Sequence, residues 1–234
     1  MAYIKTKFIN FHQIDIKVLL AVLAIIAGTM GFILIAGFVT SGSSDIIDMK
    51  ILKAFRYSDN LARPIGPRWL FEMMRDITAL GGATVIFLIT FLVIGYFILQ
   101  KEYNVVILVL AAFIGGVIMD FELKELFGRI RPEFIPRLIP EISFSFPSGH
   151  SMMSAIIYLS LAAIIARIQK RRREKIYIIA IALFLSFIIG ISRVYLGAHY
   201  PTDVLGGWSL GLAWAALCWL VAWYISQRNP GESI

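Results

Sequence analysis

The sequence predicts an all-α integral membrane protein: a bundle of six transmembrane helices, with a helical extramembrane segment between the first and second spans. Hydrophobic residues make up 59% of the 234 residues, whereas soluble domains contain about 45–50%. Charged residues make up only 16%, against about 25% in soluble domains. The apolar residues also gather in long uncharged runs. These three observations exclude a soluble globule, a disordered chain and a fibrous protein.

Six uncharged stretches define the spans. Three are long enough to cross about 30 Å of hydrocarbon as helices that rise about 1.5 Å per residue: residues 18–39, 77–99 and 204–227. Three are shorter: residues 104–119, 151–166 and 176–192. Length alone does not distinguish a short span from a buried core helix. In so apolar a chain we interpret all three as spans whose helices continue into the flanking polar residues.

The remaining organisation is simple. The first apolar run is longer than the roughly 7–15 residues of a signal-peptide core, so we expect it to be retained. Residues 1–234 then form a single membrane domain. Residues 40–76 form the extramembrane segment and contain two amphipathic pieces, 49–56 and 69–75. Amphipathic pieces of this kind lie in the headgroup layer or pack as ordinary extramembrane helices, and the pattern leaves both open.

The formal net charge of +7 has a membrane explanation. The basic residues lie between apolar runs, which favours membrane orientation and binding of anionic lipid or phosphate over nucleic-acid binding. Residues 167–175 contain six basic residues and one acidic residue. Short, strongly basic loops remain in the cytoplasm. We therefore expect this loop and both termini to be cytoplasmic, and residues 40–76, 120–150 and 193–203 to be extracytoplasmic.

Chemically distinctive residues gather between the third and fourth spans. Lys124 is followed seven positions later by Arg131 and then Pro132, and the run Pro-Ser-Gly-His occupies residues 147–150. The two cations can bind phosphate, arginine through a bidentate fork. Proline suits the first position of a helix. The next three residues would then form a first turn, whose free N–H groups attract an anion.

A second group lies between the fifth and sixth spans. It consists of Ser192-Arg193, then His199, then Asp203. A helix that begins near His199 would place the imidazole and the carboxylate on one face, four positions apart. The carboxylate can then accept a hydrogen bond from one ring nitrogen, which makes the other nitrogen a better nucleophile. His150, at the other predicted helix start, remains available as an acid.

Together these motifs closely resemble the signature of the type 2 phosphatidic acid phosphatase family. That signature reads Lys-x6-Arg-Pro, Pro-Ser-Gly-His and Ser-Arg-x5-His-x3-Asp, and every position and spacing matches. The resemblance covers roughly residues 75–215. It implies a six-helix membrane phosphatase that forms a phosphohistidine and needs no metal or other cofactor.

The resemblance also implies a role for each matching residue. His199 is the nucleophile, and Asp203 orients it. His150 protonates the leaving oxygen and then activates water for the second step. The residues that hold the phosphoryl oxygens are Lys124, Arg131, Ser148, Gly149 and Arg193.

The bilayer supplies the expected partner, a lipid phosphate, and no nucleic acid is expected. Candidate substrates are undecaprenyl diphosphate, phosphatidylglycerophosphate and phosphatidic acid. The resemblance points to a bacterial plasma (inner) membrane, and the orientation expected from the basic loop places the active site on the extracytoplasmic face. The sequence does not predict an oligomeric state.

Three other functions stay open on the sequence. A lipid phosphotransferase would use the same site with an alcohol in place of water. A non-enzymatic carrier of anionic lipid would use the cations but leaves the pairing of His199 with Asp203 unexplained. A vanadium-dependent haloperoxidase has a similar site, but six apolar spans argue against that soluble class.

Several residues outside the signature receive structural interpretations. Arg129 and Arg137 flank the first motif, and we favour solvated loop charges over contacts with a second phosphate or a headgroup. The glycine pairs at 81–82 and 206–207 are expected at close helix contacts. Cys218 lies in an apolar run and is expected to be a small buried hydrophobe.

Overall fold

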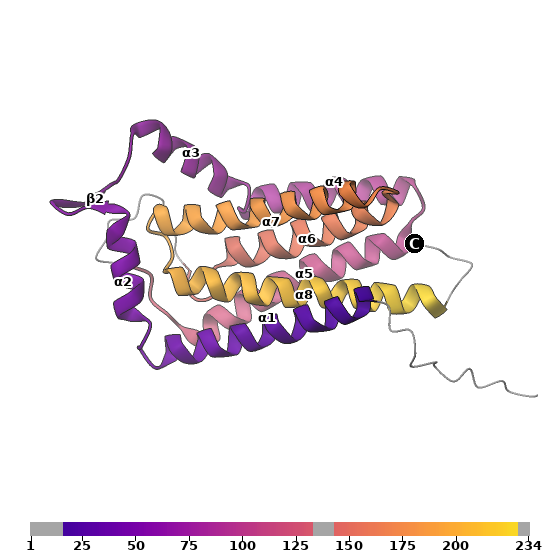
Figure 1. Cartoon of the computed structure of the whole chain (residues 1–234), viewed down its shortest axis with the longest axis horizontal. Helices are drawn as coiled ribbons and strands as arrows, with labels where there is room; N and C mark the ends of the chain where they lie inside the picture. Colours follow the sequence, from indigo (N-terminus) through magenta and orange to yellow (C-terminus); the bar gives the residue numbers. More distant parts are fainter. Residues whose placement is uncertain (1–15, 133–142, 229–234) are drawn as a thin grey trace, which may run out of the picture.

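The computed structural model describes residues 16–132 and 143–228 as a bundle of long helices with a small extramembrane region at one end (Figure 1). The helices and strands are α1 (Ile16–Thr40), α2 (Asp45–Ala54), β1 (Arg56–Tyr57), β2 (Asn60–Pro64), α3 (Arg68–Ala79), α4 (Ala83–Leu99), α5 (Tyr103–Phe127), α6 (Gly149–Ile168), α7 (Arg172–Tyr195) and α8 (Pro201–Arg228). Arg137 lies outside the described residues.

The expected all-α membrane bundle is confirmed. Five helices, α1, α5, α6, α7 and α8, are long and apolar enough to cross a bilayer. The sixth span is α4, which reaches the length of a span only together with α3; the two helices are bent by 46° relative to each other, so α3 leaves the direction of the bundle. The sequence placed this span at 77–99, but its straight part begins at Ala83, because residues 80–82 turn the chain out of the helix.

The short predicted spans do continue into polar residues, as expected. The helix predicted for 104–119 extends to Phe127, where Gly128 adopts a left-handed conformation with φ of +54° and ends it. Lys124 therefore lies on α5 rather than in a loop. Arg193 likewise lies on the last turns of α7. Both residues thus project from helices, which restricts where their side chains can reach.

The extramembrane segment between α1 and α4 contains α2 and α3, where the two amphipathic pieces lie, but also an antiparallel hairpin that the sequence did not predict. The hairpin turns at Ser58 and Asp59, and the Asn60 side chain accepts a hydrogen bond from the Ala62 amide at 3.0 Å. Such side-chain turns favour chain reversal over a helix. At this end α2 packs against the start of α8 (Figure 1).

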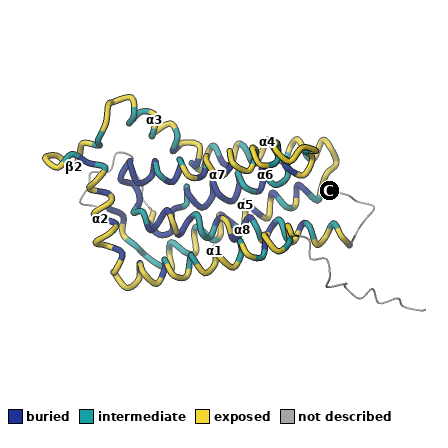
Figure 2. The backbone as a smooth tube through the Cα atoms, in the orientation of Figure 1, coloured by how far each residue is buried: buried dark blue, intermediate teal, exposed yellow. Residues whose placement is uncertain are grey.

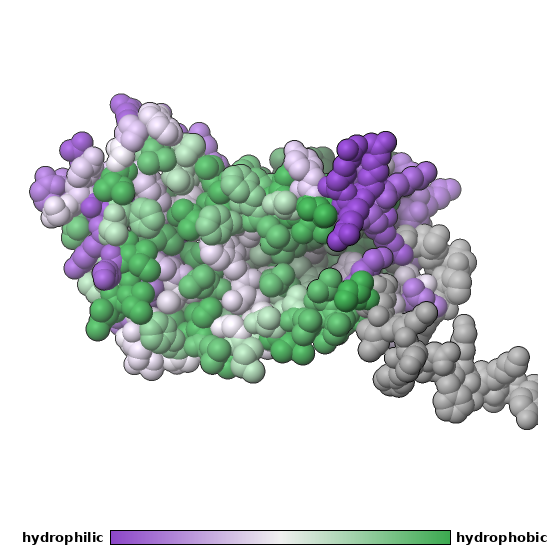
Figure 3. All heavy atoms as spheres, viewed as in Figure 1, coloured by the Kyte–Doolittle hydropathy of each residue, from purple (hydrophilic) through white to green (hydrophobic). Residues whose placement is uncertain are grey.

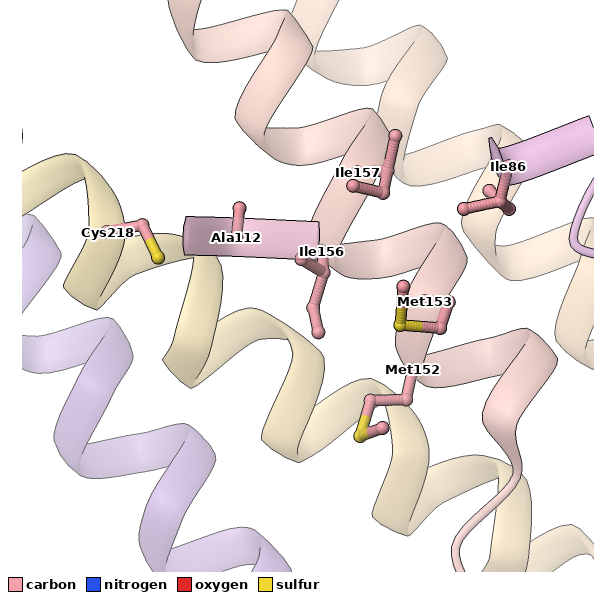
Figure 4. Packing of buried hydrophobic residues seen from close by; sticks show 7 residues of the cluster. All are labelled: Ile86, Ala112, Met152, Met153, Ile156, Ile157 and Cys218. Carbon is pink, nitrogen blue, oxygen red and sulfur yellow. The ribbon is translucent and has the colours of Figure 1, made fainter. Parts of the chain in front are cut away.

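Helix α6 forms the centre of the bundle and is the most deeply buried of the spans (Figure 2). Its side chains pack against α4, α5 and α8 in one cluster (Figure 4), formed by Ile86, Ala112, Met152, Met153, Ile156, Ile157 and Cys218. Cys218 is buried there, as expected. The outer faces of the spans remain apolar and exposed (Figure 3), as lipid contact requires.

Two glycines, one on α7 and one on α5, lie against tryptophan rings of α8. These two helices therefore pack close to α8. A Cβ added at Gly190 would lie 2.2 Å from the Trp208 ring, and one added at Gly115 would lie 2.2 Å from the Trp214 ring. The Trp208 indole donates to the Ser186 carbonyl at 3.1 Å. Close packing at small residues replaces the hydrophobic effect as the force that holds helices together in lipid.

We expect Gly190→Ala to destabilise the fold by about 1–3 kcal/mol, because the added methyl group overlaps the rigid Trp208 ring. The matched control is Gly37→Ala on α1, where nothing lies within 4 Å of the added Cβ. SDS-induced unfolding in mixed micelles measures both variants. Equal stability of the two would contradict the packing described for Gly190.

Candidate active site

All three motifs meet at one end of the bundle, where α5 and α7 end and α6 and α8 begin (Figure 1). His150 is the second residue of α6, and Asp203 lies in the first turn of α8. His199 lies in the loop between α7 and α8 and is only 1% exposed. Helix α2 lies across this end of the bundle, and the hairpin projects beyond it (Figure 1).

The two ring nitrogens of His199 have different partners. Nδ1 lies 3.3 Å from Oδ2 of Asp203, and Nε2 lies 3.0 Å from Nη1 of Arg131. A guanidinium can only donate hydrogen bonds, so Nε2 must accept and carries no proton. The proton is therefore on Nδ1, where it is donated to the carboxylate. This tautomer leaves a lone pair on Nε2.

Arg131 is a structural clamp as well as a site cation. Nε donates to the Ser143 carbonyl at 2.6 Å, and Nη2 donates to the Ser143 hydroxyl at 3.1 Å and the Phe144 carbonyl at 3.2 Å. Nη1 donates to the Ala198 carbonyl at 2.8 Å in addition to His199. These bonds use all five guanidinium donors. Four of them fix loops, and only the fifth points to the imidazole.

Asp203 is fully buried and accepts from four donors. Oδ2 accepts from His199, from the Ser145 hydroxyl and from the Tyr200 amide at 2.9 Å. Asp203 is the third residue of α8, and its carboxylate accepts from the amide of Tyr200, the residue just before the helix. A carboxylate at this position commonly caps the start of a helix in this way. Oδ1 accepts from Arg129 at 2.7 Å. Burial of a carboxylate requires such pairing.

Lys124, Arg193 and His150 lie close enough to His199 for their charges to act on its imidazole. Lys124 forms an ion pair with Asp120 on the same helix, at 2.9 Å. Arg193 is buried and donates to the Thr78 hydroxyl of α3 at 3.2 Å. Ser148 is buried immediately before α6, and its amide donates to the Asp203 carbonyl at 3.0 Å. The first turn of α6 is thereby joined to the first turn of α8.

Glycines allow this close assembly. A Cβ at Gly149 would lie 2.6 Å from Asp120 Oδ1, and one at Gly207 would lie 2.6 Å from the Ser148 carbonyl oxygen. A Cβ at Gly81 would lie 3.2 Å from the His150 carbonyl oxygen. Both glycine pairs are therefore at close helix contacts, as the sequence predicted. The contacts involve the motif residues Ser148 and His150, which the sequence did not predict.

Arg129 has a different position from the one expected. Neither a solvated charge nor a headgroup contact describes it, because its side chain is only 11% exposed. It bridges Asp203 and Asp48 of α2, donating to Asp48 at 2.8 Å. Asp48 is fully buried and also accepts from the amide and hydroxyl of Thr202. Arg129 thus connects the extramembrane helix to the carboxylate that holds His199.

The pKa of His199 is lowered well below its ordinary value of 6.5. Burial is the main cause, since it disfavours the charged imidazolium. The positive charges of Arg131, Arg193, Lys124 and His150 lower the pKa further. His199 is therefore neutral at pH 7, as a histidine that acts through a lone pair must be.

Comparison with known proteins identifies the family. The PAP2 superfamily model matches residues 103–227. Phosphatidylglycerophosphatase B of Bacillus subtilis (strain 168) is 38% identical over 187 residues, which cover 77% of this chain and 86% of that protein. An undecaprenyl-diphosphatase of Sulfolobus acidocaldarius is 28% identical over 119 residues, which cover 49% of this chain and 53% of that protein.

The fold agrees with a solved structure. The crystal structure of a transmembrane PAP2 type phosphatidylglycerolphosphate phosphatase from Bacillus subtilis matches with a TM-score of 0.74 and 31% identity. The match covers 87% of this chain and 96% of that one. The chain therefore belongs to the PAP2 superfamily. The class of protein expected from the signature, a membrane phosphatase, is thereby confirmed.

We expect Arg129→Met to destabilise the fold by about 3–5 kcal/mol, because it leaves two buried carboxylates without their shared cation. The matched control is Arg68→Met, which breaks an exposed pair with Glu72 and should cost less than about 1 kcal/mol. SDS-induced unfolding separates the two. A loss for Arg129→Met no greater than that for Arg68→Met would refute the bridging role.

The lowered pKa of His199 also makes stability depend on pH. Above pH 6.5 the imidazole is neutral in both the folded and the unfolded chain. Below pH 6.5 only the unfolded chain takes up a proton, so stability falls by up to about 1.4 kcal/mol per pH unit until the folded pKa is reached. Unfolding from pH 7.5 to pH 5 should therefore show a steeper loss for the wild type than for His199→Gln. Parallel curves would contradict a neutral buried imidazole.

Proposed function

We propose that this protein hydrolyses the phosphate of a membrane lipid through a phosphohistidine on Nε2 of His199. The observation that carries the proposal is the hydrogen-bonding of the imidazole. Asp203 holds the proton on Nδ1, and Nε2 presents its lone pair to a cluster of cations. A neutral, oriented nucleophile beside fixed positive charge is what phosphoryl transfer requires.

The first step transfers the phosphoryl group to His199. The Nε2 lone pair forms the N–P bond as the P–O bond to the lipid breaks, and that bond's electron pair leaves with the lipid oxygen. His150 donates a proton to this oxygen. The imidazole becomes cationic in the process, and the adjacent Asp203 carboxylate stabilises that charge.

The second step returns the enzyme to its starting state. His150, now neutral, removes a proton from a water molecule whose oxygen attacks phosphorus on the side opposite Nε2. The N–P bond breaks, its electrons return to Nε2, and inorganic phosphate leaves. His150 regains its proton, so acid and base alternate on one residue.

The phosphoryl oxygens are proposed to bind Lys124, Arg131, Arg193 and the first-turn amides at Ser148 and Gly149. The free-site geometry supports one specific exchange. Arg131 Nη1 donates a hydrogen bond to Nε2 in the free site. When the lone pair attacks phosphorus, Nη1 would donate this hydrogen bond to a phosphoryl oxygen in place of Nε2. The remaining four Arg131 bonds can stay in place, so the guanidinium acts without reorganisation.

Phosphatidylglycerophosphate is the first substrate we propose. Support comes from the Bacillus subtilis relative, which is named phosphatidylglycerophosphatase B and aligns over most of both chains. Undecaprenyl diphosphate is the second candidate, because an archaeal relative is named undecaprenyl-diphosphatase. Phosphatidic acid remains the third member of the expected set.

Phosphate release in detergent with excess EDTA tests the proposal on these three lipids. We expect release by the wild type, most rapidly from phosphatidylglycerophosphate, and none by His199→Ala, because the N–P bond can no longer form. Asp203→Asn should lower kcat on the order of 10⁴-fold, since the imidazole loses the partner that fixes its tautomer.

The other outcomes are equally informative. Activity that EDTA abolishes would replace the histidine mechanism with a metal mechanism. Consumption of lipid only when an alcohol acceptor is present would indicate a phosphotransferase. Lipid binding without turnover, unchanged in His199→Ala, would indicate a carrier.

We further propose that the active site faces the extracytoplasmic side of the plasma membrane. The basic loop between α6 and α7, at the opposite end of the bundle, supports this orientation through the positive-inside rule. The hairpin shares the end of the active site, because Tyr195 at the end of α7 donates to the Ile65 carbonyl beside β2 at 2.8 Å.

Cysteine labelling of intact cells tests the orientation. With Cys218 replaced by alanine, Ser58→Cys in the exposed hairpin turn should react with an impermeant thiol reagent, and Lys170→Cys in the exposed basic loop should not. Residues 194–199 are buried, so they cannot serve as labelling sites. Reaction at Lys170→Cys alone would invert the proposed topology.

A further inference from the structure

A cavity of about 520 Å³ lies at the end of the bundle opposite His199. Helix α6 begins at the active site and ends beside this cavity, whose walls are also formed by α7 and α8. Lys17 of α1 and Leu108 of α5 complete the lining. The volume is that of sites that hold small molecules or lipid chains.

The charged part of the lining is basic. Lys17, Arg167 and Lys175 come from three different helices and meet at this one cavity, and no acidic residue is among the described residues that line it. All three lie within the first or last turns of their helices. The cations are therefore at the level of the headgroups, where hydrophilic side chains gather at this end of the molecule (Figure 3).

The inner part of the lining is apolar and small. Ala163, Ala166, Ala215 and Ala222 leave the space open because their side chains are short. A second cavity of about 240 Å³, lined mainly by apolar residues, shares Leu108 and Ala222 with the first. Together the two cavities offer apolar surface to more than one hydrocarbon chain.

Two further features mark the site. Trp219 and Trp223, four positions apart on one face of α8, both line the cavity; tryptophan favours the boundary between headgroups and hydrocarbon. Ser160 lies in the wall and is 6% exposed, and its hydroxyl has no hydrogen-bond partner among the described residues. Unpartnered buried hydroxyl groups are unusual in proteins.

We propose that this cavity is a binding site for an anionic phospholipid of the leaflet at this end of the bundle. The phosphate would lie among Lys17, Arg167 and Lys175, and the acyl chains would lie along the alanine-lined wall and into the second cavity. The order of the lining, cations at the membrane surface and apolar residues inside, matches the order of groups in a phospholipid. Basic pockets between spans bind lipid headgroups in this way.

This site is distinct from the active site, and the inference does not rest on the proposed reaction. The test therefore uses His199→Ala throughout, so that binding is read without turnover. The probe is phosphatidylserine, a phosphodiester that has no terminal phosphate to release. The purified protein is equilibrated with equal amounts of phosphatidylserine and phosphatidylcholine, and native mass spectrometry measures the lipid retained.

We expect selective retention of phosphatidylserine. Arg167→Ala and Lys175→Ala should each reduce the preference about fivefold, the effect of one cation near an anionic headgroup. The matched control pair, Lys170→Ala and Arg173→Ala, removes the same charges from the same basic segment, residues 167–175, but outside the lining. These two variants should keep the wild-type preference.

A cavity-filling variant, Ala163→Phe, should also lose the bound phosphatidylserine while keeping all charges. Brominated phosphatidylserine in phosphatidylcholine vesicles should quench the fluorescence of Trp219 and Trp223, measured as the difference from Trp219→Phe and Trp223→Phe. Equal retention of both lipids, or an equal effect of the control pair, would show only general surface attraction and overturn the proposal. Retention unchanged in Ala163→Phe would place the lipid elsewhere and overturn it as well.

Discussion

The negative charge of Asp203, enclosed away from water, is the constraint on which this end of the molecule depends. An unpaired carboxylate in such a place is prohibitively unfavourable, so the fold must bring donors to it. They come from three separate segments, at Arg129, at Ser145 and at His199 and Tyr200. Satisfying one charge therefore fixes the imidazole tautomer, the start of α8 and the docking of α2 together.

Much of this molecule follows from hydropathy and spacing. The long apolar runs predict the spans because lipid offers no partner to a polar backbone, and helices satisfy every amide internally. Hydropathy does not tell where a helix ends, however. The short spans continue into polar residues as expected, but how far they continue was not predictable: Lys124 and Arg193 lie on helices that end only at Gly128 and at the turn after Tyr195. The break at Gly81-Gly82 was hidden for the same reason, since glycine is apolar enough to continue a hydrophobic run.

The motif residues were predictable because each carries its chemistry in its own side chain, whereas their supporting residues were not. The structural role of Arg129 depends on its partners Asp48 and Asp203, which lie more than seventy positions away in the sequence, one on each side. No local spacing distinguishes such a residue from a solvated loop charge. Ser145 and Thr78 could not be predicted for the same reason. Their hydroxyl groups are part of the site only because they contact Asp203 and Arg193, and the sequence does not show those contacts.

The bond between Arg131 and Nε2 of His199 has a consequence for the release of product. In the free protein this bond occupies the lone pair of His199 Nε2 and one N–H of the Arg131 guanidinium, while four other Arg131 hydrogen bonds hold Ser143, Phe144 and Ala198. Under the proposed mechanism, inorganic phosphate competes with an internal ligand that is always present and already oriented. His199 Nε2 thus competes with phosphate for the Arg131 N–H. Such an arrangement favours rapid turnover over retention of phosphate, at the expense of tight ground-state binding.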